Sequence, residues 1–252
     1  MRLLLVEDHA QLAVPIAREL GDQHGHAVTW ARDPLAAAGD LARERFDVVV
    51  ADMLFEHLTA AFAARRGARE VSLTGPGPLL ITGLHVVRTV RRTRPDGGIV
   101  VWTSGEANRR LHLLHAYEAL RVRAFCSKSS GDGKADVLDA AIRAAAASRA
   151  FVDPVLNAYL PGDGAPTIAE TLLRDERRRA IWQALALGHH SREDIARVTG
   201  YAQRTVGNAV GGMLDDLRRL DPGLRPGARP LTELVGFASR HWEFLLDDAV
   251  RA

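Results

Sequence analysis

Five polar residues in the first 128 positions of the chain have side chains that could together hold a metal ion and a phosphoryl group. Each follows a short apolar run, and they are Glu7, Asp8, Asp52, Thr103 and Lys128. Three carboxylates in one pocket repel one another unless a cation lies among them, and carboxylate oxygens suit Mg²⁺. One carboxylate could then act as a nucleophile, while the ammonium and the hydroxyl bind phosphoryl oxygens.

Lys128 is unusual for the composition of this chain. Of its 33 basic residues only Lys128 and Lys134 are lysines, and the rest are arginines. One interpretation is chance on a solvated loop. The other is that the neighbouring acidic residues need a compact ammonium on a flexible stem, which the planar guanidinium of arginine does not supply.

The apolar runs before these residues predict a sheet that would bring them together. They predict five β-strands, at residues 3–6, 27–30, 46–51, 99–102 and 122–126, and helical patterns occur at 10–20, 34–45 and 135–148. Strands that are apolar throughout and alternate with helices are typical of a parallel sheet covered on both faces. We therefore predict an α/β fold with a five-stranded, doubly wound parallel sheet of the flavodoxin-like kind. In such a sheet the working residues lie at the carboxyl ends of the strands.

This combination of residues resembles the receiver domain of bacterial two-component response regulators of the NarL/FixJ family, across roughly residues 1–150. The motifs that carry the resemblance are VEDH (Val6–His9), Asp52, VVWTSGE (Val100–Glu106), Lys128 and AFVDP (Ala150–Pro154). The resemblance implies that a histidine kinase phosphorylates Asp52. It also implies a Mg²⁺ ion bound by Asp8, Asp52 and the backbone carbonyl of Leu54, with Glu7 acting through water, and a switch pair formed by Thr103 and Phe125.

The chain departs from the family pattern after Asp52. The family's glycine follows the phosphorylated aspartate by about eight residues, whereas here the matching residue is Gly83, 31 positions later. We interpret residues 56–81 as an insertion, with an Ala/Arg-rich part at 58–69 that can be helical and a part at 74–78 that cannot continue a helix. The insertion could act as a lid, a ligand pocket or a partner surface. The family's proline soon after the aspartate is missing, and Ser129 stands where a proline usually follows the lysine.

A haloacid-dehalogenase-type phosphotransferase would also use an aspartate after a strand. That chemistry needs a second aspartate two residues later, and Leu54 occupies the position. We therefore do not expect the protein to be an enzyme.

The second half of the chain is predicted to be helical, after a linker at 151–168 that contains the chain-breaking run Pro161–Pro166. Ser191–Leu217 predicts a helix, a turn and a helix, because Ser191 is a natural N-cap and Gly200 supplies the turn. Residues 169–221 resemble the LuxR-type output domain, whose second helix enters the major groove of DNA. This resemblance implies DNA contact by five polar residues: Arg192, Gln203, Arg204, Thr205 and Asn208.

Two features separate this region from the LuxR-type pattern. Gly207 and Ala209 stand where the family usually has a lysine and a histidine or similar group, and residues 169–221 hold nine arginines against eight acidic residues. The region is therefore not a basic patch as a whole. For Arg204 and Asn208 the alternative interpretation is a solvated surface. Residues 222–252 form a predicted C-terminal helical extension, apolar enough to pack on the output domain or to form part of a dimer interface.

The composition gives only broad limits on function. A net charge of +2 permits nucleic-acid binding without predicting it. The sequence has no apolar run near the length of a membrane span, the apolar part of its first ten residues is too short for a signal peptide, and its single cysteine, Cys126, fits a reducing cytoplasm.

We therefore expect a cytoplasmic, homodimeric, DNA-binding response regulator that controls transcription and is switched by Mg²⁺-dependent phosphorylation of Asp52. One alternative is an atypical regulator that a small ligand or a protein controls without phosphorylation. The other is an interaction adaptor that does not bind DNA.

Overall fold

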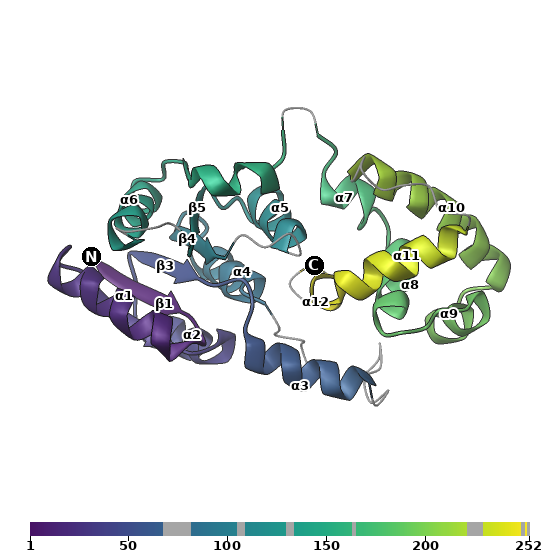
Figure 1. Ribbon diagram of the computed structural model, residues 1–252, viewed down its shortest axis with the longest axis horizontal. Coiled ribbons are helices and arrows are strands. Elements are labelled where there is room, and N and C mark those ends of the chain that lie inside the picture. The colour runs from purple at the N-terminus through teal and green to yellow at the C-terminus, as the bar shows by residue number, and fades with distance from the viewer. Residues whose placement is uncertain are drawn as a thin grey trace. The chain divides into compact units, whose positions relative to one another are not determined.

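The computed structural model describes residues 1–67, 82–104, 109–129, 134–162, 165–220, 229–247 and 250. The chain divides into two compact units (Figure 1). Unit 1 contains residues 1–59 and 80–160, and unit 2 contains residues 60–79 and 161–252.

Unit 1 is built on a parallel sheet with the strand order β2-β1-β3-β4-β5-β6. The strands are β1 (Arg2–Val6), β2 (Ala27–Ala31), β3 (Val48–Ala51), β4 (Gly98–Thr103), β5 (Ala124–Ser127) and β6 (Phe151–Val152). The prediction of a parallel α/β sheet is confirmed, but the count of five strands was wrong because the sheet has six. The sixth strand pairs only two residues with β5 and lies in the segment assigned to the linker. A two-residue strand is too short to show a periodic pattern in the sequence.

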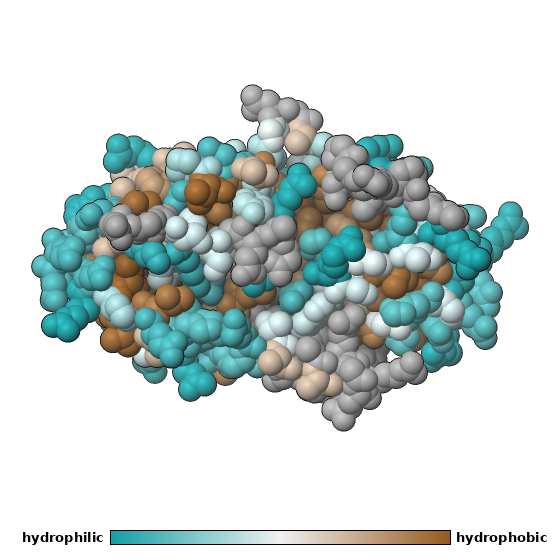
Figure 2. Space-filling model, viewed as in Figure 1, coloured by the Kyte–Doolittle hydropathy of each residue, from teal (hydrophilic) through white to brown (hydrophobic). Residues whose placement is uncertain are grey.

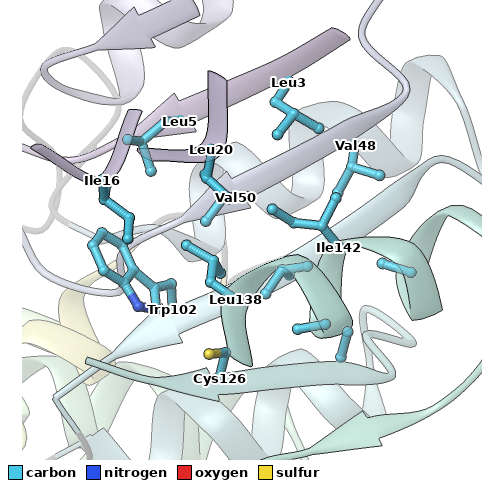
Figure 3. Close-up of a cluster of buried hydrophobic side chains, with 14 of the residues drawn as sticks. Leu3, Leu5, Ile16, Leu20, Val48, Val50, Trp102, Cys126, Leu138 and Ile142 are labelled. Atoms are coloured by element: carbon cyan, nitrogen blue, oxygen red, sulfur yellow. The ribbon is translucent and has the colours of Figure 1, made fainter. Parts of the chain in front are cut away.

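Helices cover both faces of this sheet. Helices α1 (Ala10–Asp22) and α6 (Lys134–Ala146) contact each other, whereas α4 (Leu84–Thr93) contacts both α2 (Pro34–Arg43) and α5 (Arg110–Glu118). Figure 3 shows the core beneath α1 and α6, where Ile16, Leu20, Leu138 and Ile142 face the strand residues Leu3, Leu5, Val48, Val50, Trp102 and Cys126. The uniformly apolar strands are explained by this arrangement, because residues on both faces of a covered sheet are buried.

The segment between Asp52 and Gly83 leaves the sheet and returns to nearly the same place. Leu54 forms an isolated antiparallel bridge with Thr82, and the N–H of Gly83 donates to the carbonyl of Met53 at 3.0 Å. Because the two ends of residues 56–81 meet, the interpretation of this segment as an insertion fits the backbone. Its first part forms helix α3 (Glu56–Gly67), which begins two residues earlier than predicted, and residues 68 and 69 lie outside the described residues. The second part, including residues 74–78, lies outside the described residues.

Gly83 is required where the insertion ends. A Cβ atom built on Gly83 would lie 1.8 Å from the backbone oxygen of Asp52. No side chain fits in that space, so the chain can approach the main chain of Asp52 only with glycine at this position.

Unit 2 is helical in the part of the chain that the structure describes. Its helices are α7 (Ile168–Thr171), α8 (Glu176–Ala186), α9 (Arg192–Thr199), α10 (Gln203–Leu220), α11 (Pro230–Arg240) and α12 (Trp242–Leu246). Helices α11 and α12 both contact α8, and the rings of Trp182 and Phe237 lie 5.4 Å apart. The predicted C-terminal extension therefore packs on helices of its own unit.

Hydrophilic side chains cover much of the visible described surface, and hydrophobic ones are scattered among them (Figure 2). Among the described helices, none combines the length and the apolar character that crossing a membrane requires.

Candidate phosphoryl-acceptor site and candidate nucleic-acid interface

The sheet places the predicted working residues of unit 1 at one edge. Strands β1, β3, β4 and β5 are consecutive neighbours, and their carboxyl ends lead to Glu7 and Asp8, to Asp52, to Thr103 and to Lys128 respectively. The Nζ atom of Lys128 lies 2.5 Å from Oε2 of Glu7 and 2.7 Å from Oδ2 of Asp52. It also lies 5.2 Å from the centre of the Trp102 ring. The lysine therefore joins two carboxylates from different strands, and an aromatic ring lies beside it.

Burial sets the charge balance of these groups. Glu7 is fully buried and Asp52 is 6% exposed. Burial raises the pKa of Asp52 to about 6, against the attraction of Lys128, and the negative charge of Glu7 adds to the rise. Burial disfavours the charged form of Lys128 as well, but Asp52 and Glu7 outweigh it and raise the pKa of the ammonium. At neutral pH the lysine is charged and Asp52 is an ionised, poorly solvated carboxylate, which is the state that a nucleophile needs.

The residues around Asp8 fit a divalent cation. Ligand atoms of Glu7, Asp8 and His9 lie within 4.8 Å of one another, and in the described part of the chain this is the group that could hold a metal. The Oδ1 atom of Asp8 is buried and accepts no hydrogen bond, although Nδ1 of His9 lies 2.9 Å away. Three carboxylates gather here with one ammonium and the imidazole of His9, and oxygen-rich acidic sites of this kind suit a hard divalent ion such as Mg²⁺.

The other two predicted metal ligands are Asp52 and the backbone carbonyl of Leu54. Asp52 is outside the group within 4.8 Å and connects to Glu7 through Lys128. Leu54 is buried, and the N–H of Gly83 donates to the carbonyl of Met53, so the carbonyl of Leu54 stays a predicted ligand.

The first turn of helix α3 contacts the same pocket through Glu56 and His57, two residues that the sequence did not single out. The backbone N–H of Glu56 donates to Oδ2 of Asp8 at 2.6 Å, and Nδ1 of His57 lies 3.4 Å from the same oxygen. The Oε2 atom of Glu56 lies 3.2 Å from Nε2 of His9. The available signal was a histidine at the very start of an Ala/Arg-rich helical segment, directly after the pocket sequence.

The predicted switch residues are fully enclosed. Thr103 is 1% exposed, and its carbonyl accepts the N–H of Lys128 at 2.8 Å. Phe125 is fully buried, and its ring centre lies 6.3 Å from that of Tyr117. Ser129 does not turn the lysine away from the carboxylates, because its N–H donates to Oγ of Ser127 and Lys128 still reaches both acids.

In unit 2 the residues predicted to contact DNA lie on α9 and α10, which a three-residue turn joins. Oγ of Ser191 accepts the N–H of Asp194 at 3.0 Å and caps α9, and Gly200 ends this helix with φ of 75°. Gln203, Arg204 and Asn208 are exposed on the first two turns of α10, and Thr205 is half-buried. Arg192 is also exposed, and its guanidinium would lie 3.6 Å from a Cβ atom at Gly207. The five predicted residues therefore lie on two helices, α9 and α10, that contact each other (Figure 1).

Comparisons with known proteins match the fold at low sequence identity. No protein-family model matches the sequence, and no curated protein matches it. Three solved structures that resemble the chain are the two-component response regulator RcsB in complex with DNA (TM-score 0.52), RcsB from Salmonella enterica serovar Typhimurium bound to promoter rprA in the presence of phosphomimetic BeF₃⁻ (0.53), and two RcsB dimers bound to two parallel DNAs (0.52). Each is 16% identical, and each alignment covers 95% of this chain and 98% of the other. The chain therefore has the fold of a two-component response regulator.

Proposed function

We propose that the protein is a DNA-binding response regulator of the NarL/FixJ type that controls transcription and is switched by phosphorylation of Asp52. The observation that carries this proposal is the position of Lys128, which pairs with both Glu7 and Asp52 at the carboxyl ends of neighbouring strands. A buried ammonium between two buried carboxylates is costly as a purely structural device, because replacing such a pair by apolar residues is often neutral or stabilising. A site that must bind a phosphoryl group explains the arrangement.

The residues assign a role to each group in phosphoryl transfer. An oxygen of Asp52 attacks phosphorus, the bond to the leaving group of a histidine kinase or a small phosphodonor breaks, and an acyl phosphate forms. The N–H of Met53 donates to Oδ1 of Asp52 at 2.7 Å and orients the carboxylate. Lys128 would bind a phosphoryl oxygen after its ion pair with Asp52 is broken, and Mg²⁺ held at Asp8 would neutralise the charge on the others.

Phosphorylation would then change the packing at Thr103 and Phe125. Both side chains are buried, so movement of either one must repack its neighbours. Such a rearrangement can change one face of the receiver so that it favours a dimer. Other conformational switches also respond to a local change of charge in this way. The predicted site residues, the histidine kinase partner and the homodimer are parts of this one proposal.

DNA binding is proposed for the start of α10 and for Arg192. The RcsB structures that share the fold are complexes with DNA. The exposed side chains of Arg204 and Asn208 are suited to phosphate and base-edge contacts in a major groove. A role in transcription would place the protein in the cytoplasm with the chromosome.

The proposal is tested by measuring DNA binding and oligomeric state before and after a small-molecule phosphodonor is added with Mg²⁺. We expect wild type to shift to a dimer and to bind promoter DNA more tightly, with affinity falling steeply as salt increases. Asp52→Asn should show neither change. Salt-dependent DNA binding that ignores the phosphodonor would favour a ligand- or protein-controlled regulator, and absence of DNA binding would favour an adaptor.

The ligand- or protein-controlled alternative has one observation in its favour. The first turn of α3, which belongs to the insertion, contacts Asp8 in the pocket itself. A partner that moves this turn would reach the pocket without phosphorylation.

A further inference from the structure

The first turn of α3 contacts one carboxylate oxygen of Asp8, Oδ2, and His9 lies beside the other. Oδ2 of Asp8 accepts the backbone N–H of Glu56 at 2.6 Å and lies 3.4 Å from Nδ1 of His57. Oδ1 is buried and makes no hydrogen bond, and Nδ1 of His9, another member of the candidate metal group, lies 2.9 Å from it. The side chain as a whole is 7% exposed, so solvent does not satisfy it. The start of α3 therefore holds Oδ2 of the carboxylate, while Oδ1 lies beside His9, a second possible metal ligand.

The contacts hold Asp8 more firmly than a surface loop would. Residues on either side of the insertion are tied together by the Leu54–Thr82 bridge and by the Gly83–Met53 hydrogen bond, so the point where α3 begins is fixed to the sheet. Helix α3 starts at Glu56, and a free N–H at a helix start favours a negative group. His9 adds a second connection, because its Nε2 atom lies 3.2 Å from the carboxylate of Glu56.

Groups that hold the outer oxygen of a carboxylate ligand control how it meets a metal ion. They fix its orientation, and replacing them typically costs about 10- to 100-fold in metal affinity. In this chain those groups are supplied by the insertion, through one backbone N–H and one imidazole.

We propose that the start of the insertion is a positioning part of the cation site: Glu56 and His57 hold Oδ2 of Asp8 so that Oδ1 faces a divalent cation. The inference rests on the proposed function for the presence of that cation. It assigns residues 56–57 a role in cation affinity, where the sequence left a lid, a ligand pocket or a partner surface open.

The test is a titration of the full chain with Mg²⁺, followed by tryptophan fluorescence. Trp30 donates its indole N–H to the carbonyl of Glu7 at 2.7 Å, and Trp102 lies beside Lys128, so both rings report on the pocket. Glu56→Pro removes the N–H that Asp8 uses, at the first helical position, where proline fits a helix. Glu56→Ala keeps the N–H and removes only the carboxylate, and His57→Ala removes only the imidazole.

We expect Glu56→Pro to weaken Mg²⁺ binding about 10- to 100-fold, and Glu56→Ala and His57→Ala to cause smaller losses. Wild-type affinity in a folded Glu56→Pro variant, or tighter binding, overturns the inference. If Glu56→Pro fails to fold, His57→Ala decides, and an unchanged affinity overturns the inference in that case. If wild type shows no more Mg²⁺ response than Asp8→Asn, the cation site of the proposed function fails together with the inference. If wild type responds to Mg²⁺ and the variants at Glu56 and His57 bind it with the same affinity, the inference is wrong but the cation site of the proposed function stands.

Discussion

The predicted working residues are buried and paired in unit 1, whereas they lie on the surface in unit 2. Glu7 is fully buried, Asp52 is 6% exposed, and Lys128 contacts both. Arg204 and Asn208, in contrast, are exposed on α10. Buried charges must be compensated within the fold, so substitutions at the site of unit 1 should change both function and stability. Substitutions on the surface of unit 2 should change binding and leave stability nearly unchanged.

The largest loss of stability in unit 1 is expected when a side chain at position 83 keeps the main chain there from packing on that of Asp52. In Gly83→Ala the new Cβ atom would lie 1.8 Å from the Asp52 carbonyl oxygen, so the backbone must move. We expect a loss of about 4 kcal/mol or more in the free energy of unfolding, measured by urea denaturation. Gly211 in α10 is the matched control, because nothing lies within 4 Å of its Cβ position. Gly211→Ala should stabilise by up to about 1 kcal/mol. Equal effects at the two sites would contradict the account.

Removing the ammonium should be the next largest effect. Lys128→Ala leaves Glu7 and Asp52 buried without their counter-charge, and breaking a buried pair in this way costs about 3–5 kcal/mol. The loss should be smaller near pH 5, where Asp52 can take up a proton. Lys134→Ala, at an exposed position, should stay within about 0.5 kcal/mol of wild type. Similar losses for the two lysines would show that Lys128 is a surface residue in solution.

The raised pKa of Asp52 predicts that its removal stabilises the protein without metal. The folded protein binds a proton at Asp52 more tightly than the unfolded chain, so wild type loses stability as pH rises from about 4 to about 6. Asp52→Asn should be close to wild type near pH 4 and more stable by about 3 kcal/mol above pH 6, in thermal denaturation with EDTA. A destabilised variant at pH 8 would show that the Lys128 pairing outweighs the cost of burial.

The surface of unit 2 should respond in binding and not in stability. Arg204→Ala should change the free energy of unfolding by less than about 0.5 kcal/mol. It should weaken DNA binding and reduce the salt slope by about 1 if the guanidinium contacts a phosphate. Arg240→Ala, exposed at the end of α11, is the control and should change neither. Equal DNA affinity for wild type and Arg204→Ala would contradict the proposal that this part of α10 contacts DNA.

The same contrast explains what the sequence could predict. The residues of unit 1 were found because parallel strands deliver their ends to one edge, so residue type and position were enough to group Glu7, Asp52 and Lys128. Strand β6 was not predicted because two residues are too few to show a periodic pattern of apolar side chains. The contact of His57 with Asp8 was also missed, because it depends on the through-space closure at Leu54 and Thr82. The prediction that residues of α10 contact DNA depends on the likeness of the fold. The sequence alone cannot make it, since an exposed arginine that binds a partner looks the same in the sequence as one that faces only solvent.

The most direct test of the account is the intact mass of wild type and Asp52→Asn after incubation with a small-molecule phosphodonor, with and without Mg²⁺. If Asp52 accepts the phosphoryl group beside a bound cation, wild type gains one phosphoryl group only when Mg²⁺ is present, and Asp52→Asn gains none. Equal uptake by both proteins, or uptake by wild type that does not depend on Mg²⁺, would contradict the assignment of Asp52 and its cation site.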